Sequence, residues 1–307
     1  MARDVVDPEK KISVWERARA QRILEGGSDE RKEARERADL RISALGSGSD
    51  YTPFLQHLGV ASLNLGFGGE DGGGSYHSIY DSFDHYTRFG DPGFDYGIAL
   101  AQVGGRIVLR LAEADTLPLN FGNFADTVAR YVTEVTKLVG TTRDEVAEKN
   151  RMISEGTYKA VYDPTQTYVL PKEEALPPAA PDLAPLGRAL ARLQESAKSY
   201  KAAFDSPDVR ARLSSSTDTQ TKLDQILLNF ERSTTRDAGL PRRPWFKHQV
   251  YAPGFYTGYG VKTLPGVREA VEQHNWAEAA EQVTLAAQTL ERAAAEIDRA
   301  TALLQGK

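Results

Sequence analysis

The chain has 307 residues, a net charge of −5, 40% hydrophobic and 26% charged residues, and no cysteine. This length is enough for two domains with separate cores, and the acidic balance disfavours a nucleic-acid partner. The lack of cysteine excludes disulfides, cysteine-ligated zinc and a thiol nucleophile, but it does not identify a compartment.

The N-terminal sequence MARDVVDPEKK is charged from its third residue, which is unlike a signal peptide. No apolar run approaches the roughly 18 residues that indicate a membrane span. The stretch ARDVVDP is typical of a strand that leads into a loop, as if the chain began in mid-fold. Localisation therefore stays unknown.

The first third of the chain predicts charged helices followed by an α/β segment. Residues 13–42, rich in arginine and glutamate, predict two charged surface helices with a Gly-Gly break between them. The turn at residues 46–50 carries helix-capping residues and predicts a helix over residues 51–58. The sequence VASLNLGF, from Val60, predicts a short buried strand, and a glycine-rich loop follows it.

Two further helices complete this pattern. Residues 78–90 predict a short helix or turn, and apolar residues at helical spacing predict a buried helix over residues 94–114. Another helix is expected over residues 123–139. A strand, a glycine loop and a long helix in this order indicate an α/β arrangement.

The second half is expected to be mainly helical. Six prolines in residues 160–187 predict an extended linker. The last helix has large residues at heptad spacing beside small alanines, which predicts a tightly packed bundle seam. The seam contains Trp276, Val283, Leu290, Ile297 and Leu304. The long, aromatic-rich segment 239–266 has little regular pattern, which favours a functional role.

None of the five histidines lies in a local zinc motif such as His-Glu-x-x-His. His57 is expected to be a hydrogen-bonded structural residue, and His274 a solvated one, whereas His248 is ambiguous. His77 differs because it follows the predicted strand and glycine loop, where α/β proteins place their sites. Asp81, four residues further on, is placed to orient its ring.

Several blocks of sequence resemble glutamate carboxypeptidase II and its relatives, a group within the co-catalytic zinc aminopeptidase superfamily that includes the catalytically silent transferrin receptor. These blocks are LGSGSDYTPFLQHLGVASLNLGF, GGGSYHSIYDSFDHYTRFGDPGF and IALAQVGGRIVLRLAEADTLPLNF. The later block GLPRRPWFKHQVYAPGFYTGYGVKTLPGVREAV resembles the same group's C-terminal dimerisation domain. The resemblance extends over residues 40–304.

The resemblance implies two parts. Residues 1–140 would be the α/β C-terminal part of a zinc-peptidase domain, present incompletely. Residues 141–307 would be an all-α helical bundle, the transferrin receptor-like dimerisation domain. It also implies a homodimer that forms through the C-terminal helices. Complete members of the family are mostly secreted, periplasmic or membrane-anchored.

The resemblance also implies roles for particular residues. His77 occupies the position of the family's last zinc ligand, and Tyr76 that of a tyrosine that donates to the oxyanion of the tetrahedral intermediate. The turn of Ser47, Gly48 and Ser49 matches a segment that lines the substrate cleft. Tyr259 matches a tyrosine that holds the C-terminal carboxylate of the peptide substrate.

The chain also departs from the family pattern. The other ligands of the two zinc ions and the Glu-Glu general base lie upstream of the matched region, and Glu173-Glu174 lacks their context. One histidine cannot hold a two-zinc site. Gly258 replaces a lysine of glutamate-specific members, and Asn64 and Gly66 lie where those members have arginines. Strict glutamate specificity is therefore disfavoured.

Two functions of different classes stay open at this point. The first is the C-terminal portion of a zinc-dependent exopeptidase that hydrolyses peptides with metal-activated water, is inactive alone and has an upstream peptidase half as its partner. The second is a non-catalytic dimerisation or interaction module of the transferrin receptor type, supported by the missing ligands and the self-complementary seam. A split or truncated reading frame is a third explanation.

Overall fold

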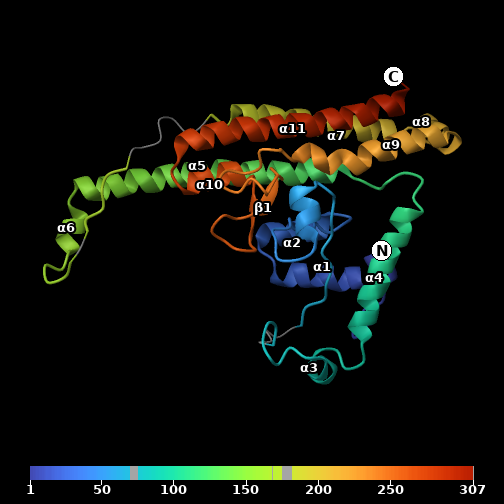
Figure 1. Cartoon of the computed structure of the whole chain (residues 1–307), viewed down its shortest axis with the longest axis horizontal. Helices are drawn as coiled ribbons and strands as arrows, with labels where there is room; N and C mark the ends of the chain where they lie inside the picture. Colours follow the sequence, from blue (N-terminus) through green and yellow to red (C-terminus); the bar gives the residue numbers. More distant parts are fainter. Residues whose placement is uncertain (70–74, 168, 175–181, 307) are drawn as a thin grey trace. The chain divides into compact units, whose positions relative to one another are not determined.

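The computed structural model describes residues 1–69, 75–167, 169–174 and 182–306 (Figure 1). These residues form helices, irregular segments and one two-stranded sheet. They divide into two compact units. The first unit comprises Met1–Ser43 and Leu63–Pro118, and the second comprises Ala44–Ser62 and Leu119–Lys307.

The first unit contains short helices and one longer helix. Its elements are η1 (Ala2–Asp4), α1 (Val14–Glu25), α2 (Ser28–Glu36), α3 (Phe83–His85), η3 (Tyr86–Gly90) and α4 (Asp95–Ala112). The predicted pair of charged helices is confirmed, and its Gly-Gly break separates α1 from α2. Helix α1 starts at Val14 because the preceding Ser13 and Glu16 form a reciprocal capping box.

Helix α4 is present as predicted, but its predicted burial is wrong for most of its apolar face. Ala99 and Val103 form a small core with Val5. By contrast, Val108 and Leu109 are 65% and 58% exposed. A helix buries an apolar face only where another element covers it. In the described part of the first unit, the small core on α4 is completed by Val5 and Val14 of the N-terminal segment.

The strand predicted from Val60 is not formed. Residues 59–69 lie outside any helix or strand. A strand needs a neighbouring backbone to satisfy its N–H and C=O groups, and apolar sequence alone does not supply one. Among the described residues the strands are β1 (Tyr251–Pro253) and β2 (Val261–Thr263), both far along the chain. The α/β peptidase portion therefore stays a prediction.

The second unit is mostly helical, as expected for the later part of the chain. Its helices are η2 (Pro53–His57), α5 (Phe121–Ser154), α6 (Thr157–Val161), α7 (Ala184–Phe204), α8 (Pro207–Ser215), α9 (Thr217–Asn229), η4 (Phe230–Thr234), α10 (Pro265–Glu272) and α11 (Trp276–Gln305). The domain boundary predicted after residue 140 stays a prediction, and α5 is one continuous helix across it.

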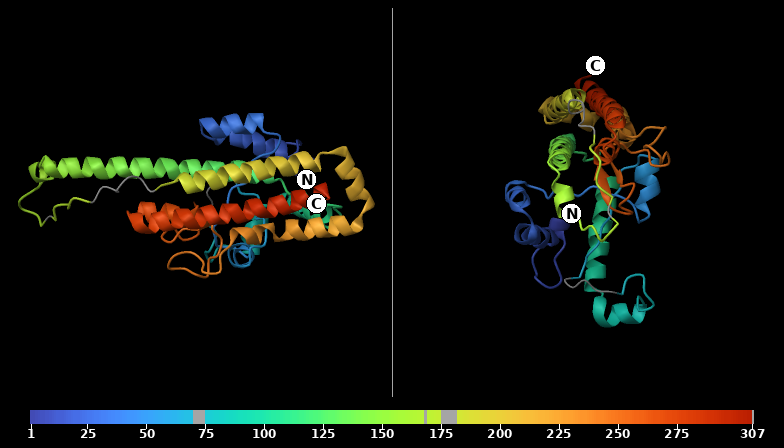
Figure 2. Two further views of the ribbon diagram at one scale, coloured as in Figure 1. Left: turned by 90° about the horizontal axis from the view of Figure 1, so that it is seen from above. Right: turned by 90° about the vertical axis from the view of Figure 1, so that its left-hand side faces the viewer.

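Helix α11 lies alongside α7 and also contacts α9, α10 and η4 (Figure 2). Its heptad residues Leu290, Ile297 and Leu304 are fully buried within this single chain. The alanines beside them, including Ala293 and Ala300, are equally buried, which lets neighbouring helices approach closely. The seam is therefore the core of the subunit, which corrects its interpretation as a self-complementary dimer surface.

The aromatic-rich segment folds into a small hairpin. Strands β1 and β2 pair antiparallel, with Tyr251 opposite Thr263 and Pro253 opposite Val261. The connection between them carries Tyr259, and α10 starts soon after β2. In the part of the chain that the structure describes, no helix is both long and apolar enough to cross a membrane.

Candidate functional site

The turn at Ser47 and the hairpin residue Tyr259, far apart in sequence, lie together in the second unit. The Ser47 N–H donates to the Tyr259 carbonyl at 3.3 Å. The Tyr51 hydroxyl donates to the Ser47 carbonyl at 3.0 Å, which holds the turn from its other side. We call Ser47, Gly48, Ser49 and Tyr259 the cleft wall. Its role in binding substrate stays a prediction.

Glycine is required at two positions of this turn. A Cβ at Gly46 would lie 2.1 Å from the Tyr259 carbonyl oxygen. Gly48 has a φ of +99°, and a Cβ there would lie 2.9 Å from the Tyr259 ring. Both distances are too short for a side chain, so the turn backbone rests directly on Tyr259. The tyrosine side chain itself is 71% exposed, which leaves its hydroxyl accessible to a ligand.

Tyr76, His77 and Asp81 lie in the first unit. The Tyr76 and His77 rings stack with their centroids 3.8 Å apart, and Tyr76 is 73% exposed. His77 has a φ of +60°, a left-handed conformation that non-glycine residues seldom adopt. The Asp81 N–H donates to the Ser78 carbonyl, and its carboxylate makes no hydrogen bond to His77 within the described part of the chain.

The residues present do not fit a zinc site on their own. Among the described residues, no three histidine, aspartate or glutamate side chains converge in a way that would hold a metal ion. Zinc needs at least three protein ligands in its catalytic sites.

Glu174, half of the predicted solvated pair, hydrogen-bonds to Lys149 and to His274 Nδ1. His274, expected to be solvated, is thus held by a hydrogen bond of 2.6 Å to the Glu174 carboxylate.

His57 is the hydrogen-bonded structural histidine that the sequence predicts. Its Nδ1 lies 2.8 Å from the Trp245 carbonyl oxygen. Its ring also stacks on the Trp245 indole with centroids 5.0 Å apart. The two contacts fix η2 against the aromatic-rich segment.

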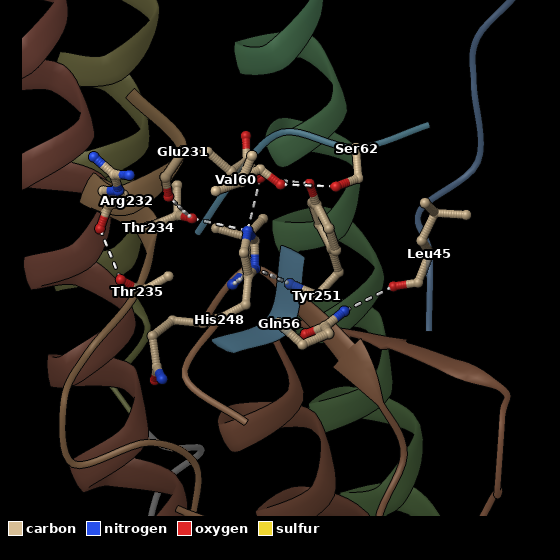
Figure 3. A network of polar contacts seen from close by, with 12 residues as sticks. Leu45, Gln56, Val60, Ser62, Glu231, Arg232, Thr234, Thr235, His248 and Tyr251 are labelled. Carbon is tan, nitrogen blue, oxygen red and sulfur yellow. Dashed lines mark hydrogen bonds and ion pairs between the residues drawn. The ribbon is translucent and has the colours of Figure 1, made fainter. Parts of the chain in front are cut away.

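A buried polar network around His248 is the feature that sequence reasoning missed (Figure 3). His248 is fully buried, and its Nε2 lies 2.8 Å from both Glu231 Oε1 and Thr234 Oγ1. The Tyr251 hydroxyl donates to the same Glu231 oxygen at 2.7 Å. These contacts join η4 to β1.

The hydrogen bonds of His248 indicate its tautomer. Its Nδ1 accepts from the backbone N–H groups of Val250 and Tyr251, each at 3.3 Å. A nitrogen that accepts cannot carry the proton, so a neutral ring carries it on Nε2 and donates towards Glu231. His248 therefore acts here as a structural bridge between backbone and carboxylate.

Burial and charge oppose each other at Glu231. Burial raises the pKa of a carboxyl, but hydrogen bonds from His248 and Tyr251 and the proximity of His248 outweigh it, and the pKa of Glu231 is lowered. The pKa of Tyr251 is raised well above its ordinary value by burial and by the Glu231 carboxylate. Glu231 is therefore the ionised acceptor and Tyr251 the neutral donor near neutral pH.

Comparison with known proteins agrees with this arrangement of helices. Residues 181–298 match the transferrin receptor-like dimerisation domain. A probable glutamate carboxypeptidase, LAMP1, of Arabidopsis thaliana is 30% identical over 74% of this chain and 27% of its own length. A probable glutamate carboxypeptidase of Arthroderma benhamiae is 30% identical over 81% of this chain and 29% of its own. The aminopeptidase NAALADL1 of Rattus norvegicus is 28% identical over 85% of this chain and 32% of its own length.

Helices α7 to α10 and most of α11 thus lie in the matched transferrin receptor-like dimerisation domain. The chain belongs to the glutamate carboxypeptidase II and transferrin receptor-like family, which confirms the resemblance seen in its sequence. It spans about a third or less of the length of these curated relatives.

Proposed function

We propose that this chain is the C-terminal portion of a zinc-dependent exopeptidase, supplying a dimerisation domain and one wall of the peptide cleft. The observation that carries the proposal is the seating of the glycine-containing turn at Ser47 on Tyr259. Two segments that the family pattern assigns to one cleft are adjacent here. The carboxypeptidase and aminopeptidase names of the relatives support peptide hydrolysis by the complete protein.

Within the cleft wall, Tyr259 would bind the C-terminal carboxylate of a peptide. A phenol hydroxyl donates one hydrogen bond, and its exposed position lets a carboxylate reach it. Gly258 beside it contributes no cation. A substrate with an acidic side chain would bring a second carboxylate, which a cation would have to bind. Because Gly258 supplies none, we propose that the peptidase prefers substrates with apolar or general side chains.

Tyr76 and His77 would act only together with further residues. The Tyr76 phenol would donate to a developing oxyanion, and His77 would contribute one nitrogen ligand to a zinc ion. Zinc supplies a nucleophilic hydroxide when it is bound. Because the described residues do not fit a complete zinc site, we propose that the chain alone does not hydrolyse peptides.

Assays of the purified chain test this proposal. With zinc added, it is expected to hydrolyse neither unblocked dipeptides nor dipeptides blocked at the N-terminus. Zinc-dependent turnover that disappears with a chelator would contradict the inactivity.

A non-catalytic dimerisation module is the second candidate, favoured by the matched domain at residues 181–298. Peptide binding separates the two functions. If Tyr259 lines a peptide cleft, a dipeptide with a free C-terminus should bind and change the NMR signal of Tyr259. The C-terminal amide of the same dipeptide should bind more weakly, and Tyr259→Phe should weaken the binding of the free dipeptide. A pure dimerisation module predicts no response to either peptide.

A further inference from the structure

Gln56 bridges three segments of the second unit. It lies on η2, and its side chain is fully buried. The Gln56 backbone carbonyl oxygen accepts from the Lys247 N–H at 2.7 Å and the His248 N–H at 3.3 Å. Its side-chain Nε2 donates to the carbonyl oxygens of Leu45 at 3.0 Å and Gly46 at 3.2 Å. The Gln56 side chain therefore holds the turn before the cleft wall (Figure 3), and its backbone carbonyl holds the segment that leads into β1.

The other end of this link is anchored by the His248 network. The His248 ring accepts from Val250 and Tyr251 and contacts Glu231 on η4, so the backbone entering β1 is fixed to the helical bundle. Strand β1 pairs with β2, and their connection carries Tyr259. Tyr259 is thus held through the hairpin.

The two halves of the cleft wall are held by two sets of buried contacts, and both sets include Gln56 or the His248 segment bonded to its backbone carbonyl. The turn half is held by the Gln56 side chain, and the Tyr259 half by the hairpin that His248 anchors. The halves meet where the Ser47 N–H reaches the Tyr259 carbonyl. Buried amides are costly unless they are hydrogen-bonded, and the Gln56 Nε2 uses both of its donors on this turn.

We infer that Gln56, supported by the Glu231–His248 pair, is a positioning residue that holds the Ser47–Gly48 turn against Tyr259. It touches no proposed substrate group and acts through the cleft wall. The inference rests on the proposed function only for the statement that the cleft wall binds a substrate. The positioning of the turn by Gln56 depends on contacts within this chain alone.

The test uses the full chain with a fluorotyrosine placed at position 259, observed by fluorine NMR, together with amide hydrogen exchange. Gln56→Met keeps the length of the side chain and removes its donors. Gln282→Met, at a buried glutamine on α11 away from the turn, is the matched control for lost stability. Circular dichroism establishes that each variant is folded.

The expected result is a changed fluorine signal in Gln56→Met and an unchanged one in Gln282→Met. Two lost hydrogen bonds should accelerate exchange at residues 45–48 by about 5- to 30-fold. Equal signals and equal exchange in the two variants would overturn the inference.

Two additions keep the outcome decisive. If Gln56→Met does not fold, Gln56→Leu replaces it, and in the unsubstituted chain the Ser47 amide must be protected from exchange. An unprotected Ser47 amide overturns the inference whatever the variants do. A separate titration with alanyl-phenylalanine and its C-terminal amide tests the proposed function alone, since silence of the Tyr259 signal there would reject the cleft and leave the positioning result intact.

Discussion

At the scale of single residues, Gly48 and Gly258 both have positive φ, but their surroundings differ. Gly48 lies under the Tyr259 ring, whereas a Cβ at Gly258 would meet nothing within 4 Å. Gly258→Ala should cost about 1–2 kcal/mol from backbone strain alone. Gly48→Ala should cost about 2–5 kcal/mol because it adds a clash with the ring. Urea denaturation measures both free energies, and equal losses would contradict the close approach.

The ionised Glu231 should make stability depend on pH. Because its folded pKa is lowered, its stabilisation is present above the ordinary value of 4.5 and is lost as pH falls through the folded value. Glu231→Gln should therefore be less stable than the unsubstituted chain by about 1–3 kcal/mol at pH 7. Denaturation at several pH values should show that difference shrinking below pH 4.5. A constant difference would argue against an ionised Glu231.

The sequence predicts the proximity of the Ser47 turn to Tyr259 but not the network beneath it, and the substrate role of both stays a prediction. Family pattern alone assigned the Ser47 turn and Tyr259 to one cleft, and the structure brings them together. The pairing of Glu231 with His248 has no such signal, since neither residue lies in a recognised motif. Which carboxylate meets a histidine depends on how η4 and β1 pack, and a periodic pattern does not encode this. His248 therefore stayed ambiguous until its partners were visible.

At the scale of elements, the α11 seam supplies the clearest prediction. Ile297 is fully buried between helices, whereas Leu228 on α9 is 63% exposed. Ile297→Ala should lower the free energy of unfolding by about 2–5 kcal/mol because it leaves a cavity. Leu228→Ala should change it by less than about 0.5 kcal/mol. Urea denaturation compares them, and a near-neutral Ile297→Ala would reject the internal seam.

Helices were predicted more reliably than strands for a physical reason. The existence of α1, α2, α4 and α11 follows from local periodicity and caps, since a helix satisfies its own backbone. The strand from Val60 depended on neighbours that the same stretch cannot specify. Helix α5 continues to Ser154, beyond the predicted end, and Thr142 and Val146 extend its buried face past Val139.

At the scale of the whole molecule, the transferrin receptor-like domain supports self-association. Because the α11 seam is internal, a second copy must bind an outer face of the unit. Sedimentation equilibrium should give a dimer at micromolar concentration, and Ile297→Ala should leave the dimer mass unchanged under conditions where the variant is folded. A monomer throughout the micromolar range would contradict self-association.

The central claim is that this chain provides a dimerisation domain and part of a cleft without holding a two-zinc site by itself. Native mass spectrometry after incubation with zinc tests the dimer and the missing two-zinc site in one measurement. The account predicts a dimer that retains no pair of zinc ions in either chain. A species that keeps two zinc ions per chain would contradict it, whatever its oligomeric state.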